Sequence, residues 1–99
     1  MKPYIEDPEG NELRYLNQHA SIHAARVLEI GCGEGRLTWQ YGEQAGTVAA
    51  IDPSIPRLGK ARGSLPVGLA RMLIFVAARA EALPFPAESF DLAILSYSL

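Results

Sequence analysis

The sequence predicts an α/β fold built on a doubly wound parallel sheet. Four short apolar stretches, residues 27–30, 47–51, 72–77 and 92–96, have the length and composition of buried strands. Segments of helical character separate the first three. Strands this apolar are typical of a parallel sheet that is covered on both faces. Right-handed crossovers then give the strand order 3-2-1-4, with a ligand at the carboxyl edge near the first strand.

The composition fits one small globular domain. The chain has 99 residues, of which 48% are hydrophobic and 20% charged, and its formal net charge is −2. This balance gives no electrostatic footprint for nucleic acid or for an anionic membrane. No stretch approaches the ~20 apolar residues of a membrane span, and the first residues lack the apolar core of a signal peptide. The single cysteine, Cys32, excludes an internal disulfide and fits a reducing cytoplasm.

We expect the chain to begin with an N-terminal arm and helix, residues 1–25, ahead of the sheet domain. The first six residues are predicted to be a loose arm. Asp7 followed by Pro8 is a typical helix start, and an apolar face follows it. His19 and His23 would share one face of this helix. Because no acid or cysteine lies beside them, they do not indicate a metal site.

The first strand leads into a glycine-rich turn, which is the centre of the predicted site. Gly31, Gly33 and Gly35 occupy alternate positions, and a helix-forming run over residues 36–45 follows them. Backbone without Cβ atoms lets a ligand come close, so strand, turn and helix together predict a ligand cradle. The helix N-terminus at Gly35 would turn its free N–H groups toward the ligand. Gly46 is expected to end the helix.

The spacing of the glycines and the charges around them argue against a dinucleotide. The dinucleotide fingerprint needs a third glycine three residues after the second, and Arg36 stands there. A pyrophosphate favours N–H donors without nearby carboxylates, whereas Glu29 precedes this turn and Glu34 lies within it. Two acids suit a ligand with positive charge, such as an ammonium or a sulfonium. An NAD(P)-binding half-domain is therefore the less favoured alternative.

The second strand ends in a carboxylate that suits a ribose. Asp52 follows directly after residues 47–51. A carboxylate at this position can accept hydrogen bonds from the 2′- and 3′-hydroxyls of an adenosine, whether the ligand is an adenosyl sulfonium or NAD. The alternative role is an N-cap for a helix begun by Pro53 and Ser54. We favour the ribose because of the turn upstream.

The two helices of the sheet domain are expected to differ in quality. The apolar face of residues 36–45 predicts packing in the core. Residues 57–64 predict only a poor helix, because Gly59 and Gly63 interrupt them and Pro56 delays the start.

These motifs resemble those of the class I S-adenosylmethionine-dependent methyltransferases. The pattern E-x-G-x-G-x-G that begins at Glu29 resembles the first motif of that family. Residues 48–52 resemble its second strand with the terminal acid, and residues 80–91 resemble the approach to its fourth strand. The resemblance covers residues 26–99 in the order and spacing of the family. It implies a Rossmann-like fold and the N-terminal part of a methyltransferase domain.

The resemblance implies S-adenosylmethionine as cofactor and methyl transfer to an acceptor, with a small molecule favoured. The implied cofactor-binding residues are Glu29, Gly31, Cys32, Gly33, Gly35, Asp52, Pro53, Ala80, Glu81 and Ser96. Glu29 would favour the cationic amino-acid end of the cofactor, and Asp52 would fix the ribose. Arg79 stands where the family often has an acid that binds the adenine amine, so adenine contact would depend on the Ala80 backbone, with Glu81 as a helper. No catalytic residue is identified.

The resembled family continues with three more strands, and these are missing from the sequence up to Leu99. We therefore expect an N-terminal fragment or a truncated product. In such a chain the strand at residues 92–96 would be an exposed edge, able to mediate self-association. An alternative function follows, that of a cofactor-binding fragment with no activity alone. Asp91, at the start of this strand, is expected to have a structural role in capping or pairing.

Overall fold

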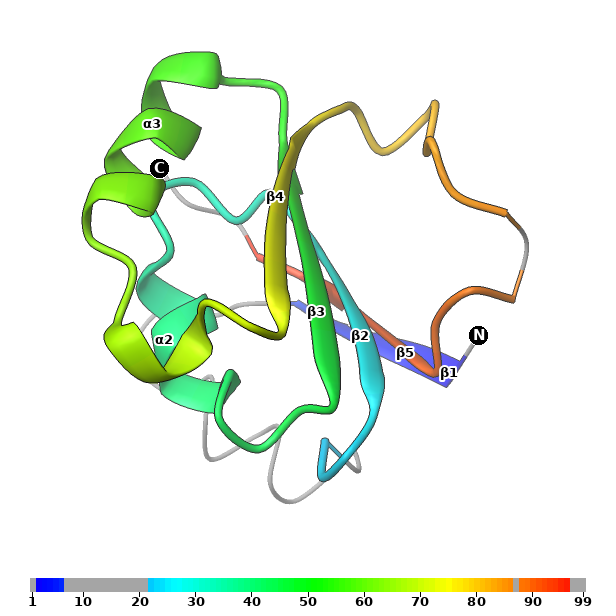
Figure 1. Ribbon diagram of the computed structural model, residues 1–99. Coiled ribbons are helices and arrows are strands. Elements are labelled where there is room, and N and C mark those ends of the chain that lie inside the picture. The colour runs from blue at the N-terminus through cyan, green and yellow to red at the C-terminus, as the bar shows by residue number, and fades with distance from the viewer. Residues whose placement is uncertain (1, 7–21, 87, 97–99) are drawn as a thin grey trace.

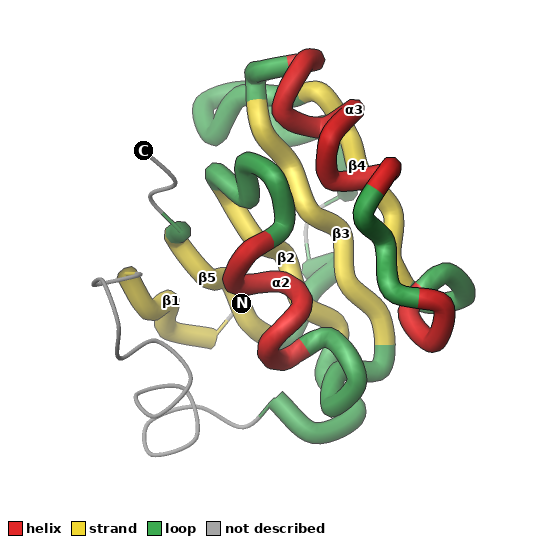
Figure 2. The backbone as a smooth tube through the Cα atoms, turned by 90° about the vertical axis from the view of Figure 1, so that its left-hand side faces the viewer, coloured by secondary structure: helices red, strands yellow, loops and turns green. Residues whose placement is uncertain are grey.

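A computed structural model describes residues 2–6, 22–86 and 88–96 as a parallel sheet with helices against one face (Figures 1 and 2). The strand order is β1-β5-β2-β3-β4, and every pairing is parallel. The elements are β1 (Lys2–Glu6), β2 (Arg26–Ile30), α2 (Arg36–Tyr41), β3 (Thr47–Asp52), α3 (Ile55–Gly63), the 3₁₀ turn η1 (Val67–Leu69), β4 (Leu73–Ala77) and β5 (Leu92–Leu95). The order β4-β3-β2-β5 within this sheet confirms the predicted order 3-2-1-4.

The first residues of the chain form a strand, so the prediction of a loose arm is wrong. β1 pairs with β5, with Lys2 opposite Leu92 and Glu6 opposite Leu95. This pairing covers the edge of β5 that we expected to be exposed, because backbone N–H and C=O groups of a strand need partners. The reason given for self-association through that edge is therefore removed. The helix predicted after Asp7 lies outside the described residues.

The two faces of the sheet are covered differently. Because side chains alternate along a strand, Val27 faces α2 and α3, whereas Leu28 faces the other side. On the helix-covered face the predicted apolar side of residues 36–45 is buried, with Leu37 and Tyr41 in the core. Both faces are apolar, which explains strands without a polar side.

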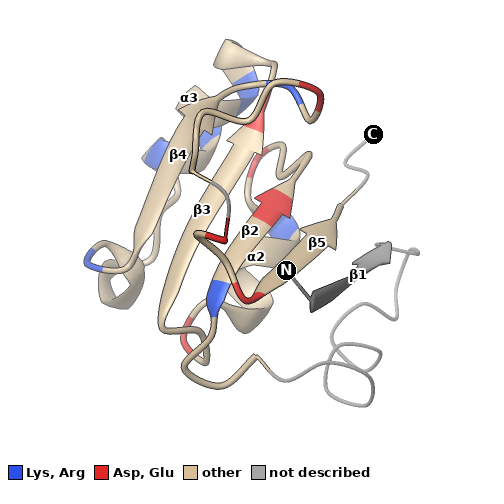
Figure 3. Cartoon of the chain, turned by 90° about the vertical axis from the view of Figure 1, so that its right-hand side faces the viewer, with Lys and Arg blue, Asp and Glu red and all other residues tan. Residues whose placement is uncertain are grey.

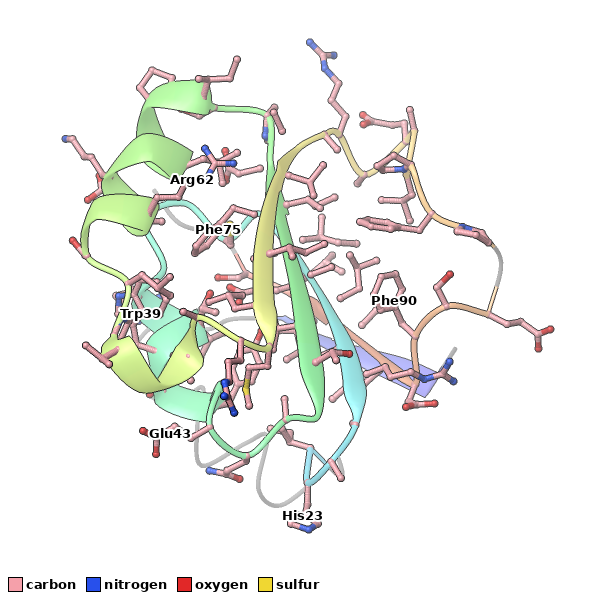
Figure 4. All side chains as sticks on the ribbon, in the orientation of Figure 1. His23, Trp39, Glu43, Arg62, Phe75 and Phe90 are labelled. Carbon is pink, nitrogen blue, oxygen red and sulfur yellow. The ribbon has the colours of Figure 1, made fainter. Side chains whose placement is uncertain are left out.

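On the opposite face, the segment of residues 78–90 packs over the sheet (Figure 1). Phe85 and Phe90 of this segment form an edge-to-face pair, with ring centroids 5.1 Å apart. Phe75 of β4 and Trp39 of α2 form a similar pair on the helix-covered side, 6.0 Å apart. Figure 4 shows Phe90 on one side of the sheet, and Phe75 and Trp39 on the other. These aromatic side chains therefore secure the loop on one face and the helix layer on the other.

Helix α2 is shorter than predicted. It ends at Tyr41, and the N–H of Gly42 donates to the carbonyl of Thr38 over 2.9 Å. A Cβ at Gly42 would press against that carbonyl and against Leu69 of η1, so the chain turns here. Gly46, the expected end of the helix, instead lies where the backbone passes close to the Ala24 carbonyl.

Helix α3 is continuous, in contrast to the poor helix predicted. Its N-cap is Ser54, whose Oγ accepts a hydrogen bond from the N–H of Arg57 over 3.3 Å. The alternative in which Asp52 caps this helix is therefore wrong. Gly59 lies inside the helix with open space around it. Burial of Leu58 and Ala61 offsets the cost of a helical glycine, about 1 kcal/mol.

An ion pair joins the starts of β2 and β5. The Arg26 guanidinium donates to both carboxylate oxygens of Asp91, over 2.8 and 3.2 Å, and the Arg26 backbone N–H donates to Oδ2 over 2.9 Å. The structural role predicted for Asp91 is confirmed. Hydrogen bonding to Arg26 lowers the pKa of Asp91 to about 2. The side chains are 53% and 45% exposed, so solvent screening keeps the contribution to stability small.

We predict that Asp91→Asn lowers the thermal unfolding midpoint slightly at pH 7. Because the pKa of Asp91 in the folded chain lies below its ordinary value of 3.8, the stabilisation is complete above about pH 4. It is lost as the pH falls toward the folded-state pKa of about 2. The difference between wild type and variant, followed by circular dichroism, should therefore shrink over this range. A difference that stays constant with pH would contradict the ion pair.

Candidate functional site

The candidate site lies where β2 and β3 end. Ile30 and Ile51 pair at the ends of these neighbouring strands, so the chain leaves the sheet side by side at Gly31 and at Asp52. Figure 3 shows acidic segments next to each other near the carboxyl ends of these strands. The chain passes from β2 to β3 on one side and returns as β5 on the other. Such a point of reversal is where parallel sheets open a crevice for ligands.

The three glycines of the turn adopt backbone conformations that other residues rarely adopt. The φ angles of Gly31, Gly33 and Gly35 are +82°, +58° and +95°. A Cβ at Gly31 would overlap the carbonyl oxygen of Ser96, and one at Gly35 would overlap the indole ring of Trp39. The packing of the turn itself therefore requires glycine here, in addition to any need for close approach by a ligand.

Backbone hydrogen bonds hold the start of the turn against β3. The N–H groups of Gly31 and Cys32 both donate to the carbonyl of Ile51, over 2.9 and 3.0 Å. Cys32 is buried, and its thiol pKa is raised by burial first and by the carboxylates of Glu29 and Asp52 second. The thiol therefore stays protonated, which supports its interpretation as a small residue packed beneath the turn.

Asp52 ties the glycine turn to the start of α3. The side chain is 5% exposed. Its Oδ2 accepts a hydrogen bond from the N–H of Gly33 over 2.9 Å, and its Oδ1 accepts one from the N–H of Ser54 over 2.8 Å. Each carboxylate oxygen can accept a second hydrogen bond. The geometry is therefore compatible with the predicted ribose contact, which stays a prediction.

Glu29 lies on the helix-covered face, beneath the turn. It is fully buried, and its Oε1 accepts hydrogen bonds from Thr38 Oγ1 over 2.5 Å and from the Tyr41 hydroxyl over 2.8 Å. Burial, and next the charge of Glu29, raise the pKa of Tyr41 well above its ordinary value. The phenol therefore keeps its proton and remains a donor. Thr38 and Tyr41 were not among the predicted site residues, although their spacing on a helix places both hydroxyls on one side.

A pocket of about 320 Å³ opens at the carboxyl end of β2. Its lining residues are Ile30, Gly31, Pro53, Ala78, Arg79, Ala80 and Glu81. Four of the predicted site residues, Gly31, Pro53, Ala80 and Glu81, are thus brought together from three separate parts of the chain. The volume lies at the lower end of the range of small-molecule sites.

The other predicted site residues do not line this pocket. Glu29 and Cys32 lie beneath the turn, whereas Asp52 lies beside it with its carboxylate bonded to the backbone. Ser96 is buried, and its N–H donates to the Ile30 carbonyl over 2.8 Å. These residues support the walls of the pocket rather than form them. Arg79 lines the pocket although we had noted it only as a departure from the resembled family.

The remaining charged and metal-binding candidates lie apart from the pocket. Glu34 of the turn lies 3.8 Å from Lys60 of α3, and both side chains are exposed. Within residues 2–6, 22–86 and 88–96, no group of three or more His, Cys, Asp and Glu could hold a metal ion. His23 is exposed at the far end of the sheet (Figure 4), and His19 lies outside the described residues. No helix in the described part of the chain has both the length and the apolar character to cross a bilayer.

Comparison with known proteins matches residues 27–99 to a family described as a methyltransferase domain. The chain is 39% identical over 69 residues to malonyl-[acyl-carrier protein] O-methyltransferase of Salmonella typhimurium, covering 70% of this chain and 26% of that protein. It is 35% identical over 82 residues to the ubiquinone/menaquinone biosynthesis C-methyltransferase UbiE of Stutzerimonas stutzeri, covering 78% and 32%. The chain therefore spans a third or less of these relatives.

A solved structure supports the same likeness. The crystal structure of an S-adenosylmethionine-dependent methyltransferase from Mesorhizobium loti has a TM-score of 0.71 and 26% identity to this chain. The match covers 90% of this chain and 40% of that protein. The arrangement of strands and turn described above is therefore shared with a longer protein of known fold.

We predict that Gly31→Ala destabilises the chain by about 2 kcal/mol, because a positive φ and overlap with the Ser96 carbonyl both oppose a Cβ. Denaturant unfolding of wild type and variant measures the change. Gly59→Ala in α3 is the matched control. Nothing lies near its Cβ position, so it should stabilise the chain by up to about 1 kcal/mol. Equal effects of the two substitutions would contradict the described turn.

Proposed function

The chain belongs to the methyltransferase domain family, and on that premise we propose that it is the cofactor-binding part of an S-adenosylmethionine-dependent methyltransferase. The observation that carries the proposal is the pocket beside the glycine turn. It combines Gly31, Pro53 and Ala80 in its lining, with the carboxylate of Asp52 next to it. Apolar walls with a few polar groups at fixed positions are typical of nucleoside and cofactor sites.

The residues present fit an adenosyl group. Ile30, Pro53 and Ala78 supply apolar surface for the faces of an adenine ring. Asp52 has one acceptor position left on each oxygen, which suits the two ribose hydroxyls. When bound, S-adenosylmethionine supplies a methyl group on a sulfonium, which is already an excellent leaving group. The contribution of this chain is then to bind and orient the cofactor.

The charges beneath the turn favour the same class of ligand. Glu29 and Asp52 are both close enough to raise the pKa of the Cys32 thiol that lies between them. Lys60 is exposed, and its ammonium lies near Glu34. The turn is thus backed by negative charge, which attracts the cationic amino-acid end of the cofactor and repels a pyrophosphate.

The backbone of the turn also argues against a dinucleotide. A pyrophosphate needs several N–H groups that point toward it. Here the N–H groups of Gly31 and Cys32 donate to Ile51, that of Gly33 donates to Asp52, and that of Gly35 donates to Cys32 over 3.1 Å. These donors are occupied within the turn. An NAD(P) half-domain is therefore the weaker candidate on geometry as well as on spacing.

Methyl transfer to a small-molecule acceptor is part of the proposal. Two relatives named for quinone biosynthesis and for a malonyl group on an acyl-carrier protein support it. No general base is assigned among the described residues. Cofactor binding without activity of this chain alone stays the alternative, and the two differ in whether a labelled methyl group leaves the bound cofactor.

We predict that Asp52→Ala raises the dissociation constant of S-adenosylhomocysteine at least tenfold in titration calorimetry, through loss of two charge-assisted hydrogen bonds. Asp91→Asn, which removes a carboxylate at the opposite end of the strands, is the matched control and should leave the affinity unchanged. Because Asp52 also holds Gly33 and Ser54, thermal unfolding of each variant is recorded in parallel. Unchanged affinity in a folded Asp52→Ala chain would remove the ribose assignment.

A second measurement separates the ligand classes. S-adenosylhomocysteine should raise the unfolding midpoint of the chain in a thermal-shift assay, because a ligand that binds only the folded state stabilises it. NAD at the same concentration should give little or no shift. A larger shift with NAD would favour the dinucleotide alternative, and no shift with either ligand would contradict a formed cofactor site.

A further inference from the structure

We propose that Thr38 and Tyr41 are positioning residues that hold the Glu29 carboxylate for recognition of the cofactor's α-ammonium group. The proposal rests on the proposed function and assigns a role to two hydroxyls of α2 on which that function did not depend. It makes recognition of the amino-acid end of the cofactor separable from recognition of its nucleoside. The steps that support it are the burial of Glu29, the geometry of its two donors and the field around the turn.

The burial of Glu29 calls for an explanation beyond packing. It is fully buried in a strand where Val27, Leu28 and Ile30 are apolar. Removing a carboxylate from water is expensive, and an apolar residue of similar size usually serves stability as well or better. A buried carboxylate directly beneath a ligand turn is therefore more easily explained by binding than by folding.

The donors orient the carboxylate from one side. Thr38 Oγ1 and the Tyr41 hydroxyl both reach Oε1, over 2.5 and 2.8 Å, from positions one turn apart on α2. Two donors on one oxygen fix the plane of the carboxylate and leave it little rotational freedom. Both donors are themselves buried, so water cannot replace either of them without rearrangement of the core. The orientation of Glu29 is thus set by α2.

The helix that carries these donors starts at the turn. Gly35 is the N-cap of α2, and its carbonyl accepts from the N–H of Trp39 over 3.0 Å. The hydrogen bonds to Glu29 therefore fasten α2, and with it the far end of the turn, to β2. The near end is fastened to β3 through the bonds from Gly31 and Cys32 to Ile51. The carboxylate and the turn above it consequently form one rigid unit.

The field around this unit favours a cation. The carboxylate of Asp52 lies on the other side of Cys32, and the two acids together raise the thiol pKa. The titratable groups that face Glu29 from α2 and the turn, Tyr41 and Cys32, both remain neutral at pH 7 because burial raises each pKa. A primary ammonium offers three donors to such a site, whereas a neutral thioether offers none.

The test compares two ligands on the full chain. S-adenosylhomocysteine carries the amino-acid end, and 5′-methylthioadenosine carries the same nucleoside and thioether without it. We expect Thr38→Val to weaken binding of S-adenosylhomocysteine about tenfold while binding of 5′-methylthioadenosine changes by less than about twofold. Thr38→Ser, which restores the hydroxyl, should recover most of the loss. Tyr41→Phe should act in the same direction as Thr38→Val.

Gln40→Ala is the matched control, because Gln40 is exposed on the same helix. It should leave both affinities unchanged. Equal losses for the two ligands in Thr38→Val and Tyr41→Phe would show a merely structural role and overturn the proposal. Unchanged affinities in both variants would overturn it as well.

The wild-type chain separates this proposal from the proposed function. If it binds 5′-methylthioadenosine as tightly as S-adenosylhomocysteine, the amino-acid end is not recognised, and only the role of Thr38 and Tyr41 fails. If it binds neither ligand, the proposed function fails too. Should Thr38→Val not fold, Tyr41→Phe and Thr38→Ser still decide the question, since each changes one hydroxyl-bearing side chain with little loss of volume.

Discussion

The site depends on the hydrogen bond from the Gly33 N–H to the Asp52 carboxylate, which spans 2.9 Å between two neighbouring strand ends. It joins the turn after β2 to the tip of β3, and the second oxygen of the same carboxylate extends the link to Ser54 and α3. From the other side, Glu29 binds α2. The turn is therefore held in shape before any ligand arrives. Such preorganisation reduces the entropy that binding must overcome.

The two layers of the molecule contribute to the pocket in different ways. The helix-covered face is closed by α2 and α3, and it supplies the buried carboxylate and its hydroxyl partners. The opposite face is covered, among the described residues, by the segment of residues 78–90, which supplies Ala78 to Glu81 to the lining. Leu83, Phe85 and Phe90 anchor this segment on the sheet. One wall of the pocket is thus rigid through helix packing, and the other through aromatic contacts of a loop.

The sequence alone predicted those parts of the fold that follow from local pattern. Strand positions come from short apolar runs, and the neighbourhood of Gly31 and Asp52 follows because carboxyl ends of adjacent parallel strands meet. The strand at Lys2–Glu6 was missed because its pairing with β5 joins residues at opposite ends of the chain. The end of α2 was misplaced because contact of Gly42 with Leu69, which is remote in sequence, decides it.

The site shows the same division. Gly31, Pro53, Ala80 and Glu81 were predicted and do meet in one pocket. The hydroxyls that bind Glu29 were missed because an apolar helix face gives no indication of which carboxylate a Thr or Tyr within it will contact. Sequence pattern thus identifies which residues can do chemistry, whereas long-range packing decides which of them are held together.

The position of β5 has a consequence for how the sheet assembles. It is the last described strand in the chain, yet it lies between β1 and β2, which come first. On a ribosome, β1 and β2 emerge without the strand that separates them, and both present open edges until β5 has been synthesised. Pairings of such high sequence separation form slowly and leave partly folded chains open to aggregation. The nascent chain is therefore most in need of chaperone protection until its central strand inserts.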